Sequence, residues 1–342
     1  MDQFFNTLTD FLETEVVPIA NRLDEEEALF REVYGRFIKL KSLNLLIPQN
    51  LGGFGGGRKE WIEYNILMAQ YSGALLFLQA QHQFSISRLK QLLPYPKVEE
   101  TLRSLAKAEQ GVGLALSKNR NLLEVKKTEE GYRLSGKFLW ATGYTYFSHL
   151  LVSFHYEDEL LYTLLPFQAM EVEGASIVVS PKIETVVFNA IDSNSVILDH
   201  WLIPQESILA RHEVLPKTPV EHPSIYNFAG ASNALLRLAI QGTYGKTAEV
   251  QGRHALLSQQ WEQYYRHIME GEKDPFALRV EGLELSEQCV LLARVACGSA
   301  GILKAHPLGR FIREIWQYTV AGYSEDQVKA YLKSWAGKDS NL

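Results

Sequence analysis

The sequence predicts an α+β protein in which helices and strands occupy separate parts of the chain. Three observations support this: helical spacing in the first hundred or so residues, then short apolar runs between turn residues, then a proline-marked return to helical spacing. Helices, then strands, then helices indicate segregated layers rather than an alternating α/β sheet. We predict an N-terminal helical domain over residues 1–108, a β-domain over 109–210 and a C-terminal helical bundle over 224–342.

The N-terminal part carries apolar residues at helical spacing. Phe4, Leu8 and Phe11 recur on one face, and residues 60–92 contain few helix breakers. Between these stretches, residues 47–57 read Ile-Pro-Gln-Asn-Leu-Gly-Gly-Phe-Gly-Gly-Gly. So many glycines cannot hold a helix, and this segment is predicted to be a loop.

The middle part carries strand and hairpin signals. Runs rich in valine, leucine, phenylalanine and tyrosine alternate with turn residues and end near Pro204, which predicts roughly six to eight strands. The predicted strands include residues 150–154, 160–165, 177–179, 186–188 and 196–198.

The C-terminal part begins after three prolines between residues 216 and 223, which mark a linker. Residues 225–268 contain no proline, and we predict one long helix there. Glycine costs helix stability, so Gly242 and Gly245 are expected to permit the close approach of a neighbouring element. Two more helices are predicted over about residues 275–303 and 307–335.

Composition narrows the class of partner. The net charge is −6, and lysines and arginines are scattered, which argues against a nucleic-acid or anionic-membrane surface. No apolar run of about 18 residues exists, and the N-terminus is unlike a signal peptide, so we expect a cytoplasmic protein with no membrane partner. Cys289 and Cys297 are expected to be buried thiols, and the histidines show no metal-ligand spacing.

Several motifs, taken together and in order, resemble the acyl-CoA dehydrogenase superfamily of flavoproteins. They are Val16 to Ala20 with Asp24, the glycine loop 47–57, residues 69–82, residues 131–143, residues 196–204, and residues 298–302 followed by 307–314. The resemblance covers nearly the whole chain. It implies a helical N-terminal domain, a middle antiparallel β-barrel and a C-terminal bundle, shortened here because the interval from Arg266 to Gly298 cannot hold all of the family's helices.

The resemblance also implies a flavin site. The cofactor would be FAD, with FMN or no flavin as the alternatives. Trp140 and Thr142 match positions that contact the flavin ring in the family, and two residues apart on a strand they are expected to share one face. The alternative is that Trp140 fills the core and Thr142 opens a turn. The implied cofactor-binding residues are Leu116, Ser117, Trp140, Thr142, Gly143, Gly298 and Gly301.

The chain departs from the family at the catalytic base. Removal of an α-proton requires a carboxylate near the reacting carbon, but the family's glutamate falls on Ala321 or Gly322, so the catalytic residue is unknown. The alternative family position, near residues 234–236, has no acid either. Glu314, Glu325 and Asp326 are the nearest carboxylates in the sequence, and we expect them to face solvent or to form ion pairs.

Two further departures concern the rest of the cofactor. The family's flavin- and acyl-CoA-binding loop is replaced by residues 114–121, where only Ser117 keeps a comparable hydroxyl. Lys118 and Arg120 either attract a phosphate or form a solvated loop. The glutamine that holds the FAD tail from a neighbouring subunit falls on Val295.

Three functions remain open. The first is a flavin-dependent oxidoreductase that lacks the glutamate base, resembles the flavin monooxygenases of this fold, and acts on a small molecule, such as an acyl-CoA or an aromatic compound. The second is an acyl-CoA dehydrogenase with a displaced base, and the third is a flavin-free structural or regulatory homologue. Because the family's flavin sites usually need at least a dimer, the resemblance also implies a homo-oligomer.

Overall fold

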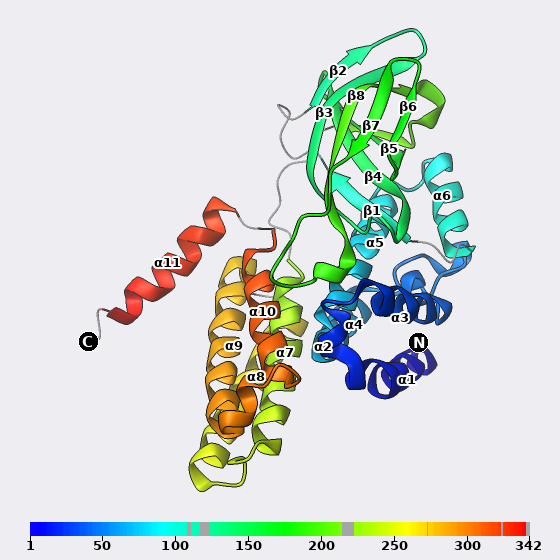
Figure 1. Ribbon diagram of the computed structural model, residues 1–342. Coiled ribbons are helices and arrows are strands. Elements are labelled where there is room, and N and C mark those ends of the chain that lie inside the picture. The colour runs from blue at the N-terminus through cyan, green and yellow to red at the C-terminus, as the bar shows by residue number, and fades with distance from the viewer. Residues whose placement is uncertain (108–110, 117–122, 214–221, 272, 323, 340–342) are drawn as a thin grey trace.

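The computed structural model describes residues 1–107, 111–116, 123–213, 222–271, 273–322 and 324–339. Figure 1 shows three layers of structure: N-terminal helices, two β-sheets above them, and a C-terminal helical bundle beside them. The last helix projects away from the bundle. This is the predicted α+β order of helices, strands and helices.

The N-terminal helices are α1 (Asp2–Phe11), α2 (Ala20–Leu23), α3 (Glu27–Lys39), α4 (Arg58–Tyr71), α5 (Gly73–Gln91) and α6 (Pro96–Lys107). A π-turn, η1 (Leu12–Val16), and a 3₁₀ turn, η2 (Val17–Ile19), connect α1 to α2.

The glycine-rich segment between α3 and α4 is a loop, as predicted, apart from one short 3₁₀ turn. Gly52 and Gly55 have φ of +97° and +67°, a region that favours glycine. At Gly53 a β-carbon would lie 2.2 Å from the carbonyl oxygen of Ile47. The glycines therefore allow the loop to fold back against its own backbone.

The strands form two sheets rather than the closed barrel that the resemblance implied. One sheet has the order β1, β4, β5, β9 and the other the order β2, β3, β8, β7, β6. The barrel expectation is wrong, because neither sheet pairs its first strand with its last. It is also wrong in strand direction at one place, since β1 pairs with β4 in parallel. Ring contacts such as Tyr132 of β3 with Phe154 of β4, whose centroids are 5.5 Å apart, join the sheets.

The strand bounds are β1 Gly111–Leu116, β2 Leu123–Lys127, β3 Gly131–Thr142, β4 Phe147–Tyr156, β5 Glu159–Pro166, β6 Met170–Val172, β7 Ala175–Val179, β8 Ser193–Pro204 and β9 Ala210–Glu213. Two expectations fail here. Residues 186–188 form no strand, because Phe188 has a φ of +57° and donates its backbone N–H to Asp24 Oδ1 at 2.6 Å. The strands also continue past Pro204 into β9, which the sequence pattern did not reveal.

The C-terminal helices are α7 (Ser224–Gln241), α8 (Ala248–Glu270), α9 (Pro275–Cys297), α10 (Pro307–Val320) and α11 (Glu325–Asp339), with a 3₁₀ turn η8 (Gly298–Ile302) after α9. The predicted single helix over 225–268 is wrong. Gly242 has an extended ψ of 166°, and the chain turns there before α8 begins. The predicted helix over 307–335 is likewise divided, at Gly322, whose φ is +60°. The glycines therefore turn the chain instead of lying within continuous helices.

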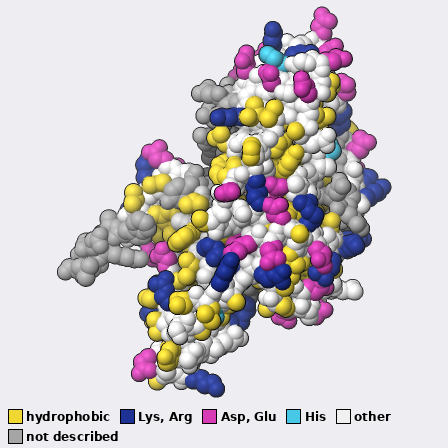
Figure 2. Space-filling model, in the orientation of Figure 1, with side chains coloured by type: hydrophobic (Ala, Val, Ile, Leu, Met, Phe, Trp, Pro, Cys, Tyr) yellow, Lys and Arg dark blue, Asp and Glu magenta, His cyan; other side chains and the backbone are white. Residues whose placement is uncertain are grey.

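The visible surface carries charges of both signs, and both cysteines are buried. In Figure 2, lysine and arginine side chains are interspersed with aspartate and glutamate on the visible face, without a large basic patch. Cys289 and Cys297 are buried and unpaired, as predicted, and burial raises the pKa of the Cys289 thiol to about 12. Among the described residues, no helix is long and apolar enough to cross a membrane.

Candidate functional site

A β-bulge shapes the end of β3, where the flavin-ring residues were predicted. The pairing of β3 with β8 shifts register between Phe138 and Ala141. A bulge adds an unpaired residue and interrupts alternation along the strand. Leu139 and Trp140 are consequently both exposed, at 46% and 61%, whereas Ala141 is fully buried. Trp140 therefore does not fill the core of the β-domain, although a turn does follow Thr142, as the same alternative predicted.

Thr142 and Gly143 are held tightly where β3 ends. Thr142 is 7% exposed, and its hydroxyl hydrogen-bonds the hydroxyl of Ser193 on β8 at 2.9 Å. Gly143 donates its backbone N–H to the carbonyl of Asp192 at 2.9 Å and has a φ of +95°. A β-carbon at Gly143 would overlap the Phe147 ring at 2.5 Å. The strand end is thus a rigid base beside the exposed indole of Trp140.

Helix α5 anchors β1, the strand that ends at Leu116. His82 is fully buried, and its Nδ1 accepts the backbone N–H of Val112 of β1 at 3.0 Å, while Nε2 lies 3.1 Å from the carbonyl oxygen of Leu43. These partners assign the neutral tautomer with the proton on Nε2. Burial lowers the pKa of His82 to about 4.

Of the residues predicted on this strand and its loop, Leu116 is the last in β1 and pairs with Ser153. Ser117, Lys118 and Arg120 lie outside the described residues.

The end of α10 leads into Ala321 and Gly322, the positions on which the family's glutamate was predicted to fall. Arg279 of α9 donates to the carbonyls of Tyr318 and Thr319 at 3.1 and 2.9 Å, which fixes the last turn of the helix. Beyond this turn, a β-carbon at Gly322 would lie 2.4 Å from Nε2 of His222. The His222 ring is positioned by Ser224, whose backbone N–H donates to Nδ1 at 3.2 Å. The imidazole therefore takes the space into which a side chain at 322 would extend.

Stacked aromatic rings connect the end of α10 to α5. Phe77 of α5 stacks on Phe188 with centroids 5.2 Å apart, and Phe188 lies 6.4 Å from the ring of Tyr318. The neighbouring Leu78 of α5 would be 3.0 Å from a β-carbon at Gly143. The end of β3 therefore packs directly on this turn of α5, and the end of α10 packs on the same turn through Phe188.

Glu314 is the buried carboxylate nearest this end of α10, but its role is to hold domains together. It is fully buried, accepts from Arg310 Nη1 at 2.8 Å and accepts the backbone N–H of Gly73 at 2.9 Å. Burial raises its pKa above the ordinary glutamate range, against the opposing effect of Arg310. The expectation of an ion pair is met at Glu314. Glu325 also pairs, with Lys329, and Asp326 is exposed.

The glycines expected to contact the FAD tail pack against their own chain. Gly298 has a φ of +56°, and a β-carbon there would lie 2.8 Å from the ring of Tyr244. At Gly301 the nearest atom would be a methyl of Leu308 at 3.0 Å. Val295, on which the resemblance places the family's glutamine, is 57% exposed. The absence of side chains at both glycines is therefore explained by internal packing, without a cofactor.

Sequence reasoning missed Ser193, Phe188, His222 and Arg279. Each meets its partner across a large separation in sequence, and none stands in a pattern that marks it. The described residues also contain no group of three or more histidine, cysteine, aspartate or glutamate side chains placed to hold a metal ion.

Comparison with known proteins agrees with the motifs. Residues 1–88 match the family model described as acyl-CoA dehydrogenase, N-terminal domain. A comparison with curated protein sequences finds no match.

Solved structures share the fold along nearly the whole chain. Butyryl-CoA dehydrogenase from Megasphaera elsdenii has a TM-score of 0.80 at 14% identity, covering 98% of this chain and 97% of that one. Nitrososynthase from Micromonospora carbonacea var. africana has a TM-score of 0.78 at 17% identity, with 96% of each chain covered. FMN-bound TdsC from Paenibacillus sp. A11-2 has a TM-score of 0.73 at 14% identity, with 98% of each covered. The resemblance to the acyl-CoA dehydrogenase superfamily is confirmed, and the chain has that fold.

Proposed function

We propose that this protein is a flavin-dependent oxidoreductase that works without the glutamate base of the acyl-CoA dehydrogenases. The observation that carries the proposal is the indole of Trp140, 61% exposed beside the buried Thr142. A large apolar ring left in water is costly, and a flat cofactor that stacks on it removes that cost. The confirmed fold supports the same interpretation, since members of the superfamily use flavin.

The residues predicted to contact the flavin ring, Trp140, Thr142 and Gly143, suit that role better than Gly298 and Gly301 suit contact with the FAD tail. Trp140 supplies an apolar surface, and the strand end at Thr142 and Gly143 is rigid enough to fix a ring edge. Leu116 and Ser117 are proposed to complete this surface. Gly298 and Gly301 are proposed to contact the tail of a flavin that is bound in the site of a partner subunit. Their internal packing gives that role no separate support. The ring is therefore expected to provide more of the affinity than the adenine half, and FMN is an alternative to FAD.

A bound flavin would supply reversible transfer of two electrons, and the chain would supply the binding surface and the exclusion of water. The position of the missing base limits the reaction. Ala321 has no acidic group, and His222 blocks a side chain at Gly322. Chemistry that does not begin with α-proton removal by a carboxylate is therefore favoured, with a small-molecule substrate of unspecified class.

The test is whether purified protein carries or takes up flavin. We expect the visible absorbance of an oxidised flavin, or a rise in melting temperature on addition of FAD or FMN, because a ligand of the native state stabilises it. Trp140→Ala should weaken flavin binding about tenfold through lost stacking and apolar contact. Leu256→Ala is the control, because it also removes an exposed apolar side chain, 44% exposed, and lies on α8, away from the predicted flavin-ring residues and from the α9–α10 surface. The proposal fails if neither flavin is present or bound.

A flavin-free homologue is the second candidate, because Gly298 and Gly301 are already explained by Tyr244 and Leu308. Absence of flavin binding would favour it. If flavin is bound, anaerobic mixing with a panel of acyl-CoAs tests for a dehydrogenase with a displaced base. We expect no bleaching of the flavin by any of them.

Oligomeric state is part of the proposal, since a partner subunit would supply the tail contacts. Exposed apolar side chains of α9 and α10, among them Leu291 and Trp316, offer a surface for a second copy. Light scattering should then give a multiple of the 38.8 kDa chain mass.

A further inference from the structure

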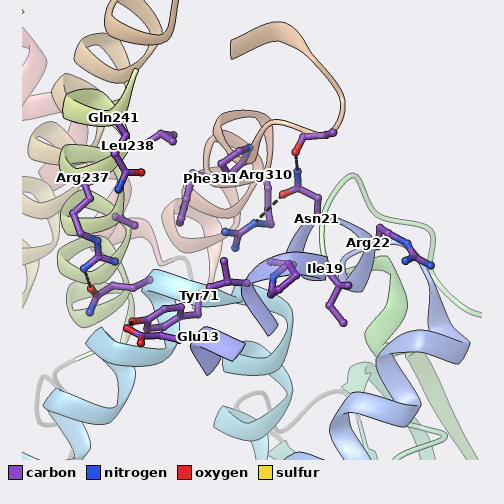
Figure 3. Close-up of a pocket in the computed structure, with 17 residues that line it drawn as sticks. Glu13, Ile19, Asn21, Arg22, Tyr71, Arg237, Leu238, Gln241, Arg310 and Phe311 are labelled. Carbon is purple, nitrogen blue, oxygen red and sulfur yellow. Dashed lines mark hydrogen bonds between the residues drawn. The ribbon is translucent and has the colours of Figure 1, made fainter. Parts of the chain in front are cut away.

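A cavity of about 680 Å³ lies between the N-terminal helices and the C-terminal bundle. One side comes from η1, η2 and α2 together with the end of α4, and the other from α7 and the start of α10. Figure 3 shows side chains from both sides turned toward the space between them. The cavity is separate from the predicted flavin-ring site, because its lining residues come from helices and turns and none comes from β1 or β3. Along α10, Arg310 also lies about 16 Å from Ala321, the predicted position of the base.

Arg310 places a fixed cation in this cavity. The residue is only 4% exposed, and its guanidinium lies 4.3 Å from the ring centroid of Phe311. Nη1 donates to Glu314 at 2.8 Å and Nε donates to Asn21 at 3.3 Å. No other described residue accepts a hydrogen bond from Nη2, and Figure 3 shows the guanidinium directed into the space beside Tyr71. A donor that is already held in place binds an anion with little loss of side-chain entropy.

Arg237 of α7 supplies a second cation on the opposite side. Its Nη1 donates to Gln70 Oε1 at 2.6 Å, so its orientation is set by a neutral partner. Among the described residues no carboxylate lies within ion-pairing distance of Arg237. The third arginine of the lining, Arg22, is paired with Glu26 at 2.7 Å. Arg237 is thus the arginine of this lining whose charge is not matched by a carboxylate within the described structure.

The rest of the lining sets the shape and polarity of a ligand. Apolar side chains make much of the wall: Val17, Pro18, Ile19, Ala234, Leu238 and Phe311. Glu13 is the acidic residue of the lining, and it accepts a hydrogen bond from the Tyr71 hydroxyl at 3.0 Å. A ligand with one anionic group and an apolar body would satisfy the guanidinium of Arg237, whose printed partner is a neutral glutamine, and the apolar wall together.

We propose that this cavity binds an organic carboxylate with an apolar body, whose carboxylate is bound by Arg237, while Arg310 lines the facing side of the cavity. Guanidinium groups match the two oxygens of a carboxylate in geometry as well as in charge. The apolar body would lie on Leu238, Phe311 and the η2 residues. This site does not depend on the proposed flavin chemistry.

The test measures binding of straight-chain monocarboxylates from butyrate to decanoate by calorimetry and by melting temperature, with chain-matched alcohols as the uncharged probes. Affinity should rise with chain length, and each carboxylate should bind about tenfold or more tightly than its alcohol. Arg237→Ala should remove most of that preference. Arg253→Ala is the matched control, because Arg253 on α8 also donates to a glutamine, Gln288, at 2.6 Å but lies outside the cavity.

Three results would overturn the proposal. One is that no carboxylate in the series binds, and another is that the alcohols bind equally well. The third is that Arg237→Ala and Arg253→Ala change affinity to the same extent. Leu238→Trp provides a second check, because a larger side chain in the apolar wall should weaken long carboxylates more than butyrate. Trp140→Ala should leave carboxylate binding unchanged, which separates this test from that of the flavin site.

Discussion

His82 should make the stability of this protein depend on pH in the weakly acidic range. The imidazole is fully buried between Leu43 and Val112, and burial lowers its pKa from 6.5 to about 4. The unfolded chain therefore takes up a proton at a pH where the folded chain does not. The His82 contribution to stability is complete above a pH of about 6.5, and it is lost progressively as the pH falls toward the folded-state pKa.

The size of this effect follows from the two pKa values. One pKa unit corresponds to about 1.4 kcal/mol, so the lowering to about 4 amounts to about 3 kcal/mol of unfolding free energy. Urea unfolding of the native protein and of His82→Gln, across this pH range at constant ionic strength, measures it. Carboxylates that titrate in the same range are common to both proteins and cancel in the difference. If the difference between the two proteins does not change with pH, the lowered pKa is wrong.

Two further comparisons between variants test how the fold is packed. Glu314→Ala should cost about 3–5 kcal/mol of unfolding free energy, because it leaves Arg310 buried without its counter-charge. The double variant Arg310→Met, Glu314→Leu should cost less, because no charge is left buried. Chemical denaturation measures both free energies. Gly53→Ala should destabilise by more than about 2 kcal/mol, because its β-carbon would meet the carbonyl of Ile47, whereas Gly35→Ala in α3 has open space and should stabilise by up to about 1 kcal/mol. Equal melting temperatures for the two alanine variants would contradict this reasoning.

Residue types alone were enough to predict the glycine loop, because its conformation depends on the residues within the loop. The glycine loop needs positive φ at Gly52 and Gly55, and glycine is the residue that supplies it without strain. The same reasoning failed at Gly242, because a glycine inside an apolar helical pattern is compatible with close packing or with a turn. The structure has both, since a β-carbon at Gly242 would also lie 2.6 Å from the carbonyl oxygen of Ala296. The sequence near Gly242 does not distinguish close packing from a turn, because the packing partner, Ala296, is distant in the sequence.

The candidate site shows the same limit. The segment containing Trp140 and Thr142 was found from its motif, but the exposure of Trp140 follows from the bulge between β3 and β8, which depends on pairing with residues more than 50 positions away. β9 was missed because its four residues, Ala-Arg-His-Glu, carry no apolar alternation. Its position is set by pairing with β5, not by its own sequence.

At Gly322, one of the two positions where the resemblance places the family's base, the local structure as well as the residue type opposes a glutamate. A glutamate at Gly322 would adopt a φ of +60°, which costs a residue with a β-carbon about 1–2 kcal/mol. It would also meet the His222 ring, which Ser224 holds in place. Arg279 meanwhile fixes the carbonyls of the preceding turn, so the backbone cannot easily move aside. A glutamate at 322 alone would therefore not fit, and this end of α10 would have to rearrange before it could present a carboxylate.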